Sequence, residues 1–255
     1  MIDMHSHILF GVDDGAKTLE DSLELIKEEV NKGVTHIIFT PHFNKRNYHL
    51  NQENVPINFQ TVKKASIKEN LNVQLYLGNE IYLDSTDYNS IMDNGFYTLA
   101  GSKYILVEFN EIIPPANMPE ICYEINMSGY IPIIAHAERY EILHNNTKML
   151  SELLNEGVHL QVNAFSVISN DNKTRNKVTH HLLKDRLVSF VASDVHNNTT
   201  RKFHLDEAYK LVIKICGIEY ADKIFIHNQL NILNDFPFDS PDFILKKNKF
   251  SKFWD

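Results

Sequence analysis

Residues 2–40 read IDMHSHILFGVDDGAKTLEDSLELIKEEVNKGVTHIIFT and contain one complete strand–helix–strand unit. Two runs rich in β-branched and aliphatic residues, 2–9 and 35–40, predict the strands. Between them, apolar residues recur at helical spacing, namely Leu19, Leu23, Ile26 and Val30. Thr18 to Asp21 resembles a helix capping box, and Gly33 occupies the position expected for a helix C-terminal glycine. The stretch therefore predicts an amphipathic helix that connects two parallel strands.

The same unit repeats along the rest of the chain. Five further strand-like runs follow, at residues 73–77, 104–109, 131–135, 159–162 and 187–192. Helical spacing recurs between and after them, in Met118, Ile121, Cys122 and Ile125 and again in Leu205, Ala208, Leu211, Val212 and Ile215. About seven such units without a low-complexity linker predict a single α/β domain over residues 1–255. Its mostly parallel sheet would be either open or closed into a barrel.

The composition is that of a globular protein. Of the 255 residues, 43% are hydrophobic and 23% are charged, which excludes disordered and collagen-like classes. No apolar run reaches the roughly 18 residues of a transmembrane helix, and the first residues lack the basic and apolar segments of a secretion signal. We therefore expect a cytoplasmic protein. The formal net charge of −8 argues against general binding to nucleic acid or to an anionic membrane.

Histidines and carboxylates follow the predicted strands at both ends of the chain. His5 and His7 share one face of the first strand, because side chains alternate with a period of two, and this spacing is typical of a bidentate metal motif. Asp3 is expected to support a ligand histidine rather than to bind metal itself. Asp194 and His196 share one face after another apolar run. Carboxylate and imidazole are common ligands of divalent first-row metals.

Further residues of the same kind accompany the other strand-like runs. His42, Glu80 and His136 each follow an apolar run. Glu108 lies inside one, and an unpaired buried charge is costly, so this carboxylate needs a cation or becomes neutral. Asp14 lies in an Asp-Asp-Gly segment, for which a simple turn is the more ordinary explanation.

Together these residues form a candidate metal-binding set of nine: His5, His7, Asp14, His42, Glu80, Glu108, His136, Asp194 and His196. Parallel α/β folds place their sites where the carboxyl ends of the strands meet. Nine ligands exceed what one tetrahedral ion requires, which favours two or three clustered ions. Because the set contains no cysteine, it does not discriminate zinc from manganese or iron.

On the basis of these motifs, the chain resembles the polymerase and histidinol phosphatase (PHP) superfamily, whose opening Asp-x-His-x-His motif matches residues 3–7. It is still more similar to the capsule-type protein-tyrosine phosphatases of Gram-positive bacteria. That similarity rests on residues 1–9, 13–15, 40–42, 78–81, 106–109, 132–139 and 192–196 and extends to about Arg201. A series of motifs in this order and spacing is far more specific than any one of them.

The resemblance implies a distorted (β/α)7 TIM-like barrel, the PHP fold, that carries three divalent ions, most often Mn²⁺, with Fe, Zn or Mg as alternatives. By matched position, one ion would be held by His5, His7, Glu80 and Asp194, a second by Glu80, Glu108 and His136, and a third by Asp14, His42 and His196. Arg139 and Arg201 match phosphate-contacting arginines. Ala137 departs from the proline that such proteins usually have there.

The implied activity is hydrolysis of phosphotyrosine on protein. The expected substrate is the tyrosine-rich tail of a bacterial tyrosine kinase that regulates capsular or exopolysaccharide synthesis. Clustered ions lower the pKa of a bridging water and neutralise phosphoryl oxygens, so a bridging hydroxide would attack phosphorus. The two arginines would bind the remaining oxygens and stabilise the transition state.

Other functions make different demands on the sequence. A cysteine-dependent tyrosine phosphatase would need Cys-x5-Arg, but Ser128 and Asp222 stand at that spacing from Cys122 and Cys216. The lack of a GxxxxGK[ST] loop argues against nucleotide-driven phosphoryl transfer. Two alternatives stay open: a PHP-type phosphoesterase that acts on a small substrate such as histidinol phosphate or on a nucleic-acid 3′ end, and a non-catalytic barrel that binds metal or the kinase. The negative net charge disfavours the nucleic-acid version.

Overall fold

The strands of the computed structural model form two parallel sheets. The structure describes residues 1–43, 51–83, 95–169 and 171–238. One sheet has the order β1 (Ile2–Ser6), β2 (His36–Phe39) and β4 (Gln74–Leu77). The other has the order β3 (His42–Phe43), β5 (Glu80–Tyr82), β6 (Tyr104–Glu108), β7 (Ile131–Ile134), β8 (His159–Asn163) and β9 (Phe190–Ala192). Every pairing among these strands is parallel.

The seven predicted strands are present, and two short strands that the sequence does not predict, β3 and β5, add to them. These follow β2 and β4 after only two residues, where the chain passes from one sheet to the other. Backbone hydrogen bonds continue across the change of sheet: Gly78 N–H donates to Phe39 O at 2.8 Å. As a result, His42 and Glu80 lie opposite each other in paired strands.

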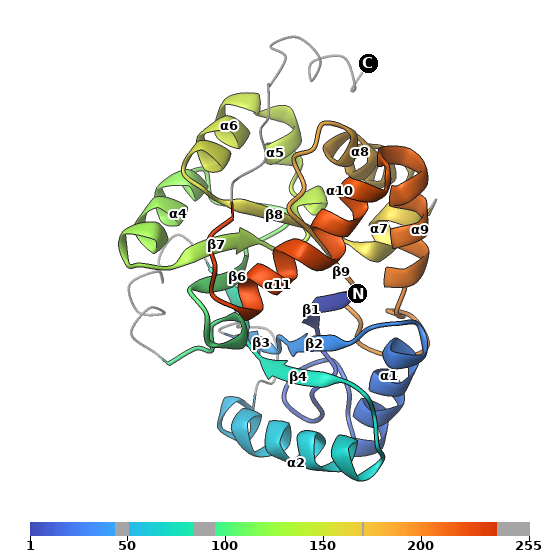
Figure 1. Cartoon of the computed structure of the whole chain (residues 1–255). Helices are drawn as coiled ribbons and strands as arrows, with labels where there is room; N and C mark the ends of the chain where they lie inside the picture. The colour runs from blue at the N-terminus through green and yellow to red at the C-terminus, as the bar shows by residue number, and fades with distance from the viewer. Residues whose placement is uncertain (44–50, 84–94, 170, 239–255) are drawn as a thin grey trace.

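The two sheets also meet beyond β9. Val195 forms an isolated parallel bridge with Ser6 at the end of β1, and Asp194 N–H donates to His5 O at 2.9 Å. Together the sheets make a curled parallel half-barrel (Figure 1). Because the paired strands are parallel, their carboxyl ends face the same side of the molecule.

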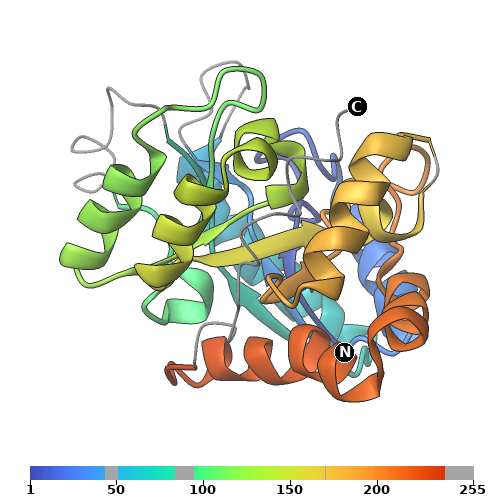
Figure 2. The ribbon, with the colours of Figure 1, turned by 90° about the horizontal axis from the view of Figure 1, so that it is seen from above.

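Helices cover the outside of the curled sheet (Figures 1 and 2). They are α1 (Leu19–Asn31), α2 (Val55–Lys68), α4 (Met118–Met127), α5 (Glu141–Asn145), α6 (Thr147–Asn155), α7 (Ala164–Ile168), α8 (Lys173–Lys184), α9 (Leu205–Cys216), α10 (Ile218–Asp222) and α11 (Asn228–Leu233). Shorter helical turns are η1 (Gln52–Asn54), η2 (Leu99–Gly101), η3 (Ala137–Arg139) and the π-helical η4 (Lys223–His227). Among the described residues, no helix has the length and apolar character needed to cross a membrane.

The capping box, the terminal glycine and the apolar face that residues 2–40 predict for the first helix are all present in α1 and its flanking residues. Thr18 Oγ1 accepts a hydrogen bond from Asp21 N–H at 3.1 Å, and Asp21 Oδ2 accepts one from Thr18 N–H at 2.9 Å, so the capping box is complete. Gly33 ends the segment at a φ of 91°, a conformation that other residues rarely adopt. The helix buries Leu23, Leu25 and Ile26 against the sheet side of the core.

His159, the first residue of β8, is buried in the core. Its ring stacks on Phe238 with a centroid distance of 4.3 Å, and its Nδ1 lies 3.1 Å from Ser189 Oγ. Only 3% of the residue is exposed. Burial, with a smaller contribution from Lys223, lowers the pKa of His159 from 6.5 to about 4, so the side chain is neutral at pH 7.

The metal-free protein should lose stability in mild acid, in part through His159. Because the pKa of His159 is lower in the folded chain, the unfolded chain takes up the proton first as the pH falls. The stabilisation is complete above about pH 6.5 and is lost as the pH approaches about 4. In urea unfolding with a chelator, a His159→Gln variant should lose about 2 kcal/mol less than the wild type between pH 7 and 5. Identical pH slopes would contradict this explanation.

Candidate metal centre

The nine predicted ligands converge at the carboxyl ends of the strands. Three overlapping groups have ligand atoms that all lie within 4.8 Å of one another: His7, Asp14, His42 and His196; His5, His7 and Glu80; and His42, Glu80 and Glu108. All are buried except Asp14, whose side chain is 30% exposed. The two remaining predicted ligands adjoin them, because His136 Nε2 lies 2.8 Å from Glu80 Oε1 and Asp194 Oδ1 lies 3.5 Å from His5 Nε2. The expectation that these residues come together is therefore met.

Unusual backbone conformations direct two of these side chains. His136 follows β7 at a φ of 35°, and Asp194 follows β9 at a φ of 55°. A non-glycine residue at positive φ costs free energy, and such residues concentrate at functional sites. At both strand ends the strain turns a histidine or carboxylate toward the shared cluster.

The loop after β1 brings Asp14 to the cluster by folding back onto His7. Ala16 N–H donates to His7 O at 3.1 Å, and Gly15 N–H donates to Asp13 Oδ1 at 2.9 Å. A Cβ atom at Gly15 would lie 1.7 Å from His7 O, so only glycine fits this contact. The other oxygen of Asp13 lies 2.8 Å from His7 Nδ1. Asp13 thereby holds the ring of His7 with Nε2 toward the cluster, while Asp14 reaches the cluster itself.

The charges within the cluster require cations. Burial raises the energy of the Glu80 carboxylate, but His5 and His42 outweigh it and hold the pKa of Glu80 well below its usual range. Burial also opposes charge on His5, yet Glu80 and Asp194 raise its pKa to about 9. Without an ion, protonated histidines thus supply the positive charge that the carboxylates need.

The donor atoms fit divalent cations. Asp14 Oδ1 and His196 Nε2 are buried and make no hydrogen bond within the described structure, although they lie only 3.4 Å apart. Buried polar atoms without partners are uncommon in native proteins and indicate an ion or water between them. The set contains only imidazole nitrogens and carboxylate oxygens, which suit manganese, iron and zinc.

Two arginines stand at the rim of the cluster. Arg201 Nη2 donates to both carboxylate oxygens of Asp194, at 2.9 and 2.8 Å, and Arg139 Nη2 donates to Asp194 Oδ2 at 3.2 Å. Arg139 Nη1 also donates to Glu111 Oε1 at 2.8 Å. The side chains of Arg201 and Arg139 are 37% and 20% exposed, respectively. Despite burial, Arg201 and His5 keep the pKa of Asp194 well below its usual range.

Asp3 contacts the backbone of the candidate ligand His5, in keeping with a supporting role. Its carboxylate accepts hydrogen bonds from Ser193 N–H at 3.0 Å and from Ser193 Oγ, and weakly from the backbone N–H of His5 at 3.5 Å. It therefore ties β1 to the segment after β9 and does not contact the ring of a ligand histidine in any described hydrogen bond. Burial raises the pKa of Asp3 to about 6.

Sequence reasoning also missed residues that contact the ligands. Asp13, Glu111, Gln161 and Asn163 each bond to a predicted ligand or arginine. Gln161 carried a usable signal, because a buried amide within an apolar strand needs a partner for the same reason as Glu108. No local pattern distinguishes Asp13 from Asp14, since both lie in the same short loop.

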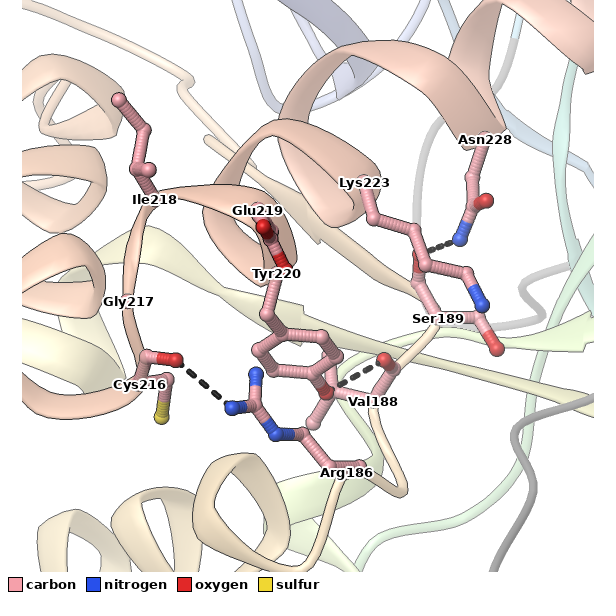
Figure 3. Close-up of a pocket in the computed structure, with 10 residues that line it drawn as sticks. All are labelled: Arg186, Val188, Ser189, Cys216, Gly217, Ile218, Glu219, Tyr220, Lys223 and Asn228. Carbon is pink, nitrogen blue, oxygen red and sulfur yellow. Dashed lines mark hydrogen bonds between the residues drawn. The ribbon is translucent and has the colours of Figure 1, made fainter.

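A cavity of about 480 Å³ lies at the opposite end of β9 (Figure 3). Its polar groups engage one another: Arg186 Nη2 donates to Cys216 O at 2.7 Å, and Tyr220 Oη donates to Val188 O at 2.8 Å. The Arg186 guanidinium also lies 4.1 Å from the centroid of the Tyr220 ring. This cavity adjoins the amino end of β9, so it is separate from the residues that converge at the carboxyl ends.

Solved structures resemble the whole fold. A chain from a study of YwqE from Bacillus subtilis and CpsB from Streptococcus pneumoniae, described there as unique metal-dependent tyrosine phosphatases, matches with a TM-score of 0.86 and 31% identity, over 96% of this chain and 99% of that one. The histidinol phosphate phosphatase of Lactococcus lactis, complexed with zinc, L-histidinol and phosphate, matches with a TM-score of 0.56 and 14% identity, over 88% and 96% of the two chains. At that identity the likeness concerns the fold alone.

Sequence relatives give the same result. The tyrosine-protein phosphatase CpsB of Streptococcus agalactiae is 36% identical over 240 residues, which are 92% of this chain and 99% of that protein. The tyrosine-protein phosphatase YwqE of Bacillus subtilis is 32% identical over 254 residues, 100% of each chain. The family model described as capsular polysaccharide synthesis, CpsB/CapC, matches residues 1–234. The chain therefore belongs to the CpsB/CapC family.

Proposed function

We propose that this chain is a metal-dependent protein-tyrosine phosphatase. The observation that carries the proposal is the convergence of three overlapping groups of largely buried imidazole and carboxylate donors beside two partly exposed arginines. Phosphate monoesters are very stable, so their hydrolysis requires both an activated nucleophile and neutralisation of the phosphoryl charge. The relatives named as tyrosine-protein phosphatases support phosphotyrosine as the substrate.

The proposed ligand sets are those that the family resemblance implies. One ion is assigned to His5, His7, Glu80 and Asp194, a second to Glu80, Glu108 and His136, and a third to Asp14, His42 and His196, with Mn²⁺ as the expected metal. The three donor groups of the structure overlap these sets and add His7 beside the third and His42 beside the second. When bound, such ions activate water and neutralise phosphoryl oxygens.

Arg139 and Arg201 are the proposed phosphate-binding residues. Their planar guanidinium groups suit bidentate hydrogen bonding to phosphoryl oxygens, which a lysine would form less well. In the absence of substrate, Asp194 holds both of them at the rim. A bound phosphate would take over donors that now face this carboxylate or the solvent, and charge that develops in the transition state would strengthen those bonds.

The proposal also includes the domain organisation, the cellular location and the protein substrate. Residues 1–255 would form a single PHP domain, a distorted (β/α)7 barrel, that works in the cytoplasm. Its protein substrate would be the tyrosine-rich tail of a bacterial tyrosine kinase that controls capsular or exopolysaccharide synthesis. Membership of a family described by capsular polysaccharide synthesis supports this setting.

Phosphate release should be manganese-dependent and specific for a phosphotyrosine peptide. The test compares this peptide with histidinol phosphate, each with Mn²⁺ and with a chelator. Release from the peptide that the chelator abolishes is the expected result. Release only from histidinol phosphate would show that the protein is a small-molecule phosphatase and would contradict the proposal. Bound metal without release from either substrate would favour a binding protein.

A further inference from the structure

Two buried amides, Gln161 and Asn163, lie on the same face of β8 beneath the candidate metal centre. Residues two apart in a strand project from the same face. Gln161 is completely buried and Asn163 is only 3% exposed. Buried amides need hydrogen-bond partners, because leaving one unsatisfied costs about 1–3 kcal/mol. Their partners therefore show what these residues do.

The two amides form a series of hydrogen bonds that connects three predicted metal ligands. Gln161 Oε1 accepts from His136 N–H at 3.0 Å and lies 3.1 Å from His5 Nδ1. Gln161 Nε2 donates to Asn163 Oδ1 at 2.9 Å. Asn163 Nδ2 donates to Asp194 Oδ2 at 2.6 Å. Ligands from β1, the end of β7 and the end of β9 are thus joined through one strand.

The hydrogen-bond partners at the two ends of this series, His136 and Asp194, determine which way each amide group is oriented. The backbone N–H of His136 can only donate, so Gln161 must present its oxygen there. The carboxylate of Asp194 can only accept when ionised, so Asn163 must present its amino group there. With its oxygen committed as an acceptor, Gln161 requires a proton on Nδ1 of His5. The Nε2 atom of His5 then faces the cluster, 3.2 Å from His7 Nε2 and 3.4 Å from Glu80 Oε1.

We propose that Gln161 and Asn163 are positioning residues that hold His5 as the Nδ1–H tautomer and fix His136 and Asp194 for metal binding. This inference rests on the metal ligands of the proposed function. A neutral amide suits the position, because it orients the ligands without adding a charge to four nearby carboxylates. The ring of His7 is held instead by the carboxylate of Asp13, so the two histidines of the motif have different supports.

The test measures Mn²⁺ binding to chelator-treated protein by calorimetry, together with the melting temperature of the metal-free protein. Gln161→Leu should weaken Mn²⁺ binding about 10- to 100-fold, which is typical for the loss of a residue that orients a ligand. Asn163→Ser should weaken it about tenfold.

Gln229→Leu is the matched control. Gln229 is also completely buried, but its amide donates to the backbone oxygens of Ile224 at 2.6 Å and Val191 at 3.4 Å, and it contacts no predicted metal ligand in any described hydrogen bond. This variant should lower the melting temperature of the metal-free protein without weakening Mn²⁺ binding. If it weakens binding as much as Gln161→Leu does, a general loss of stability explains the effect and the inference is overturned.

The outcomes separate this inference from the proposed function. A wild type that binds Mn²⁺ and hydrolyses phosphotyrosine, beside Gln161→Leu and Asn163→Ser variants with unchanged affinity, overturns the inference alone. Weakened binding in both variants, with no hydrolysis by the wild type, supports the inference and contradicts the proposed function. A wild type that binds no Mn²⁺ overturns both. If Gln161→Leu does not fold, Asn163→Ser still decides the matter.

Discussion

A Glu80→Gln variant should release phosphate from a phosphotyrosine peptide about 10³-fold more slowly than the wild type, well beyond the 10- to 100-fold effect of a supporting residue. Glu80 belongs to two of the three donor groups. Its oxygens lie 2.7 Å from His42 Nδ1 and 2.8 Å from His136 Nε2. Glutamine keeps the shape but removes the negative charge, so the metal affinity of the shared position should fall as well.

Phosphate release at saturating Mn²⁺ and metal content after gel filtration together test this prediction. Glu29→Gln is the matched control. Burial, with the nearby charge of Asp3, raises the pKa of Glu29 well above its usual range, and glutamine is nearly isosteric with glutamate. The control should retain full activity. A Glu80→Gln variant that keeps more than about a tenth of the wild-type rate would argue against Glu80 as a metal ligand.

Gly15→Ala should damage stability and activity together. Its Cβ atom would lie 1.7 Å from the backbone oxygen of His7, and backbone cannot move aside as a flexible side chain can. The loop would have to shift, which breaks the hydrogen bond from Ala16 N–H to His7 O and carries Asp13 and Asp14 away from the cluster. We expect a loss of about 2–4 kcal/mol in the free energy of unfolding. Phosphate release should fall about 100-fold, because His7 loses its support and a ligand is displaced.

Gly33→Ala controls for the general cost of replacing a glycine. A Cβ atom at Gly33 meets nothing within 4 Å, but the residue has a φ of 91°. This variant should lose about 1–3 kcal/mol through backbone strain and keep normal activity in the folded fraction. Urea unfolding and phosphate release at a temperature where each variant is folded separate the two effects. A Gly15→Ala variant that behaves like Gly33→Ala would show that the loop tolerates the displacement.

The sequence by itself was sufficient for much of this fold, because the deciding signals are local. Alternating side chains and helical spacing depend on neighbouring residues, so the seven strands and helices α1, α4 and α9 were all predictable. The same holds for the capping box between Thr18 and Asp21. The convergence of the nine candidate ligands followed from one further rule, that the carboxyl ends of parallel strands meet at one side.

The short strands β3 and β5 were beyond such reasoning. Each is only two or three residues long, too short for a periodic pattern, and lies where the chain passes from one sheet to the other. The main hydrogen-bond partner of Asp3 was also beyond such reasoning. Asp3 accepts its hydrogen bonds chiefly from Ser193, 190 residues away, and only weakly from the backbone N–H of His5.

The nine candidate ligands and the parallel α/β class were thus determined by the sequence itself, since residue type and strand position suffice to identify them, whereas the two arginines were identified only through the family resemblance. Only the tertiary structure decided which groups orient those ligands. Gln161 contacts His5 across 156 residues, and Asp13 rather than Asp14 turns toward the ring of His7. Hydrogen bonds depend on distance and direction to within a few tenths of an ångström, and no pattern of neighbouring residues specifies those between distant segments.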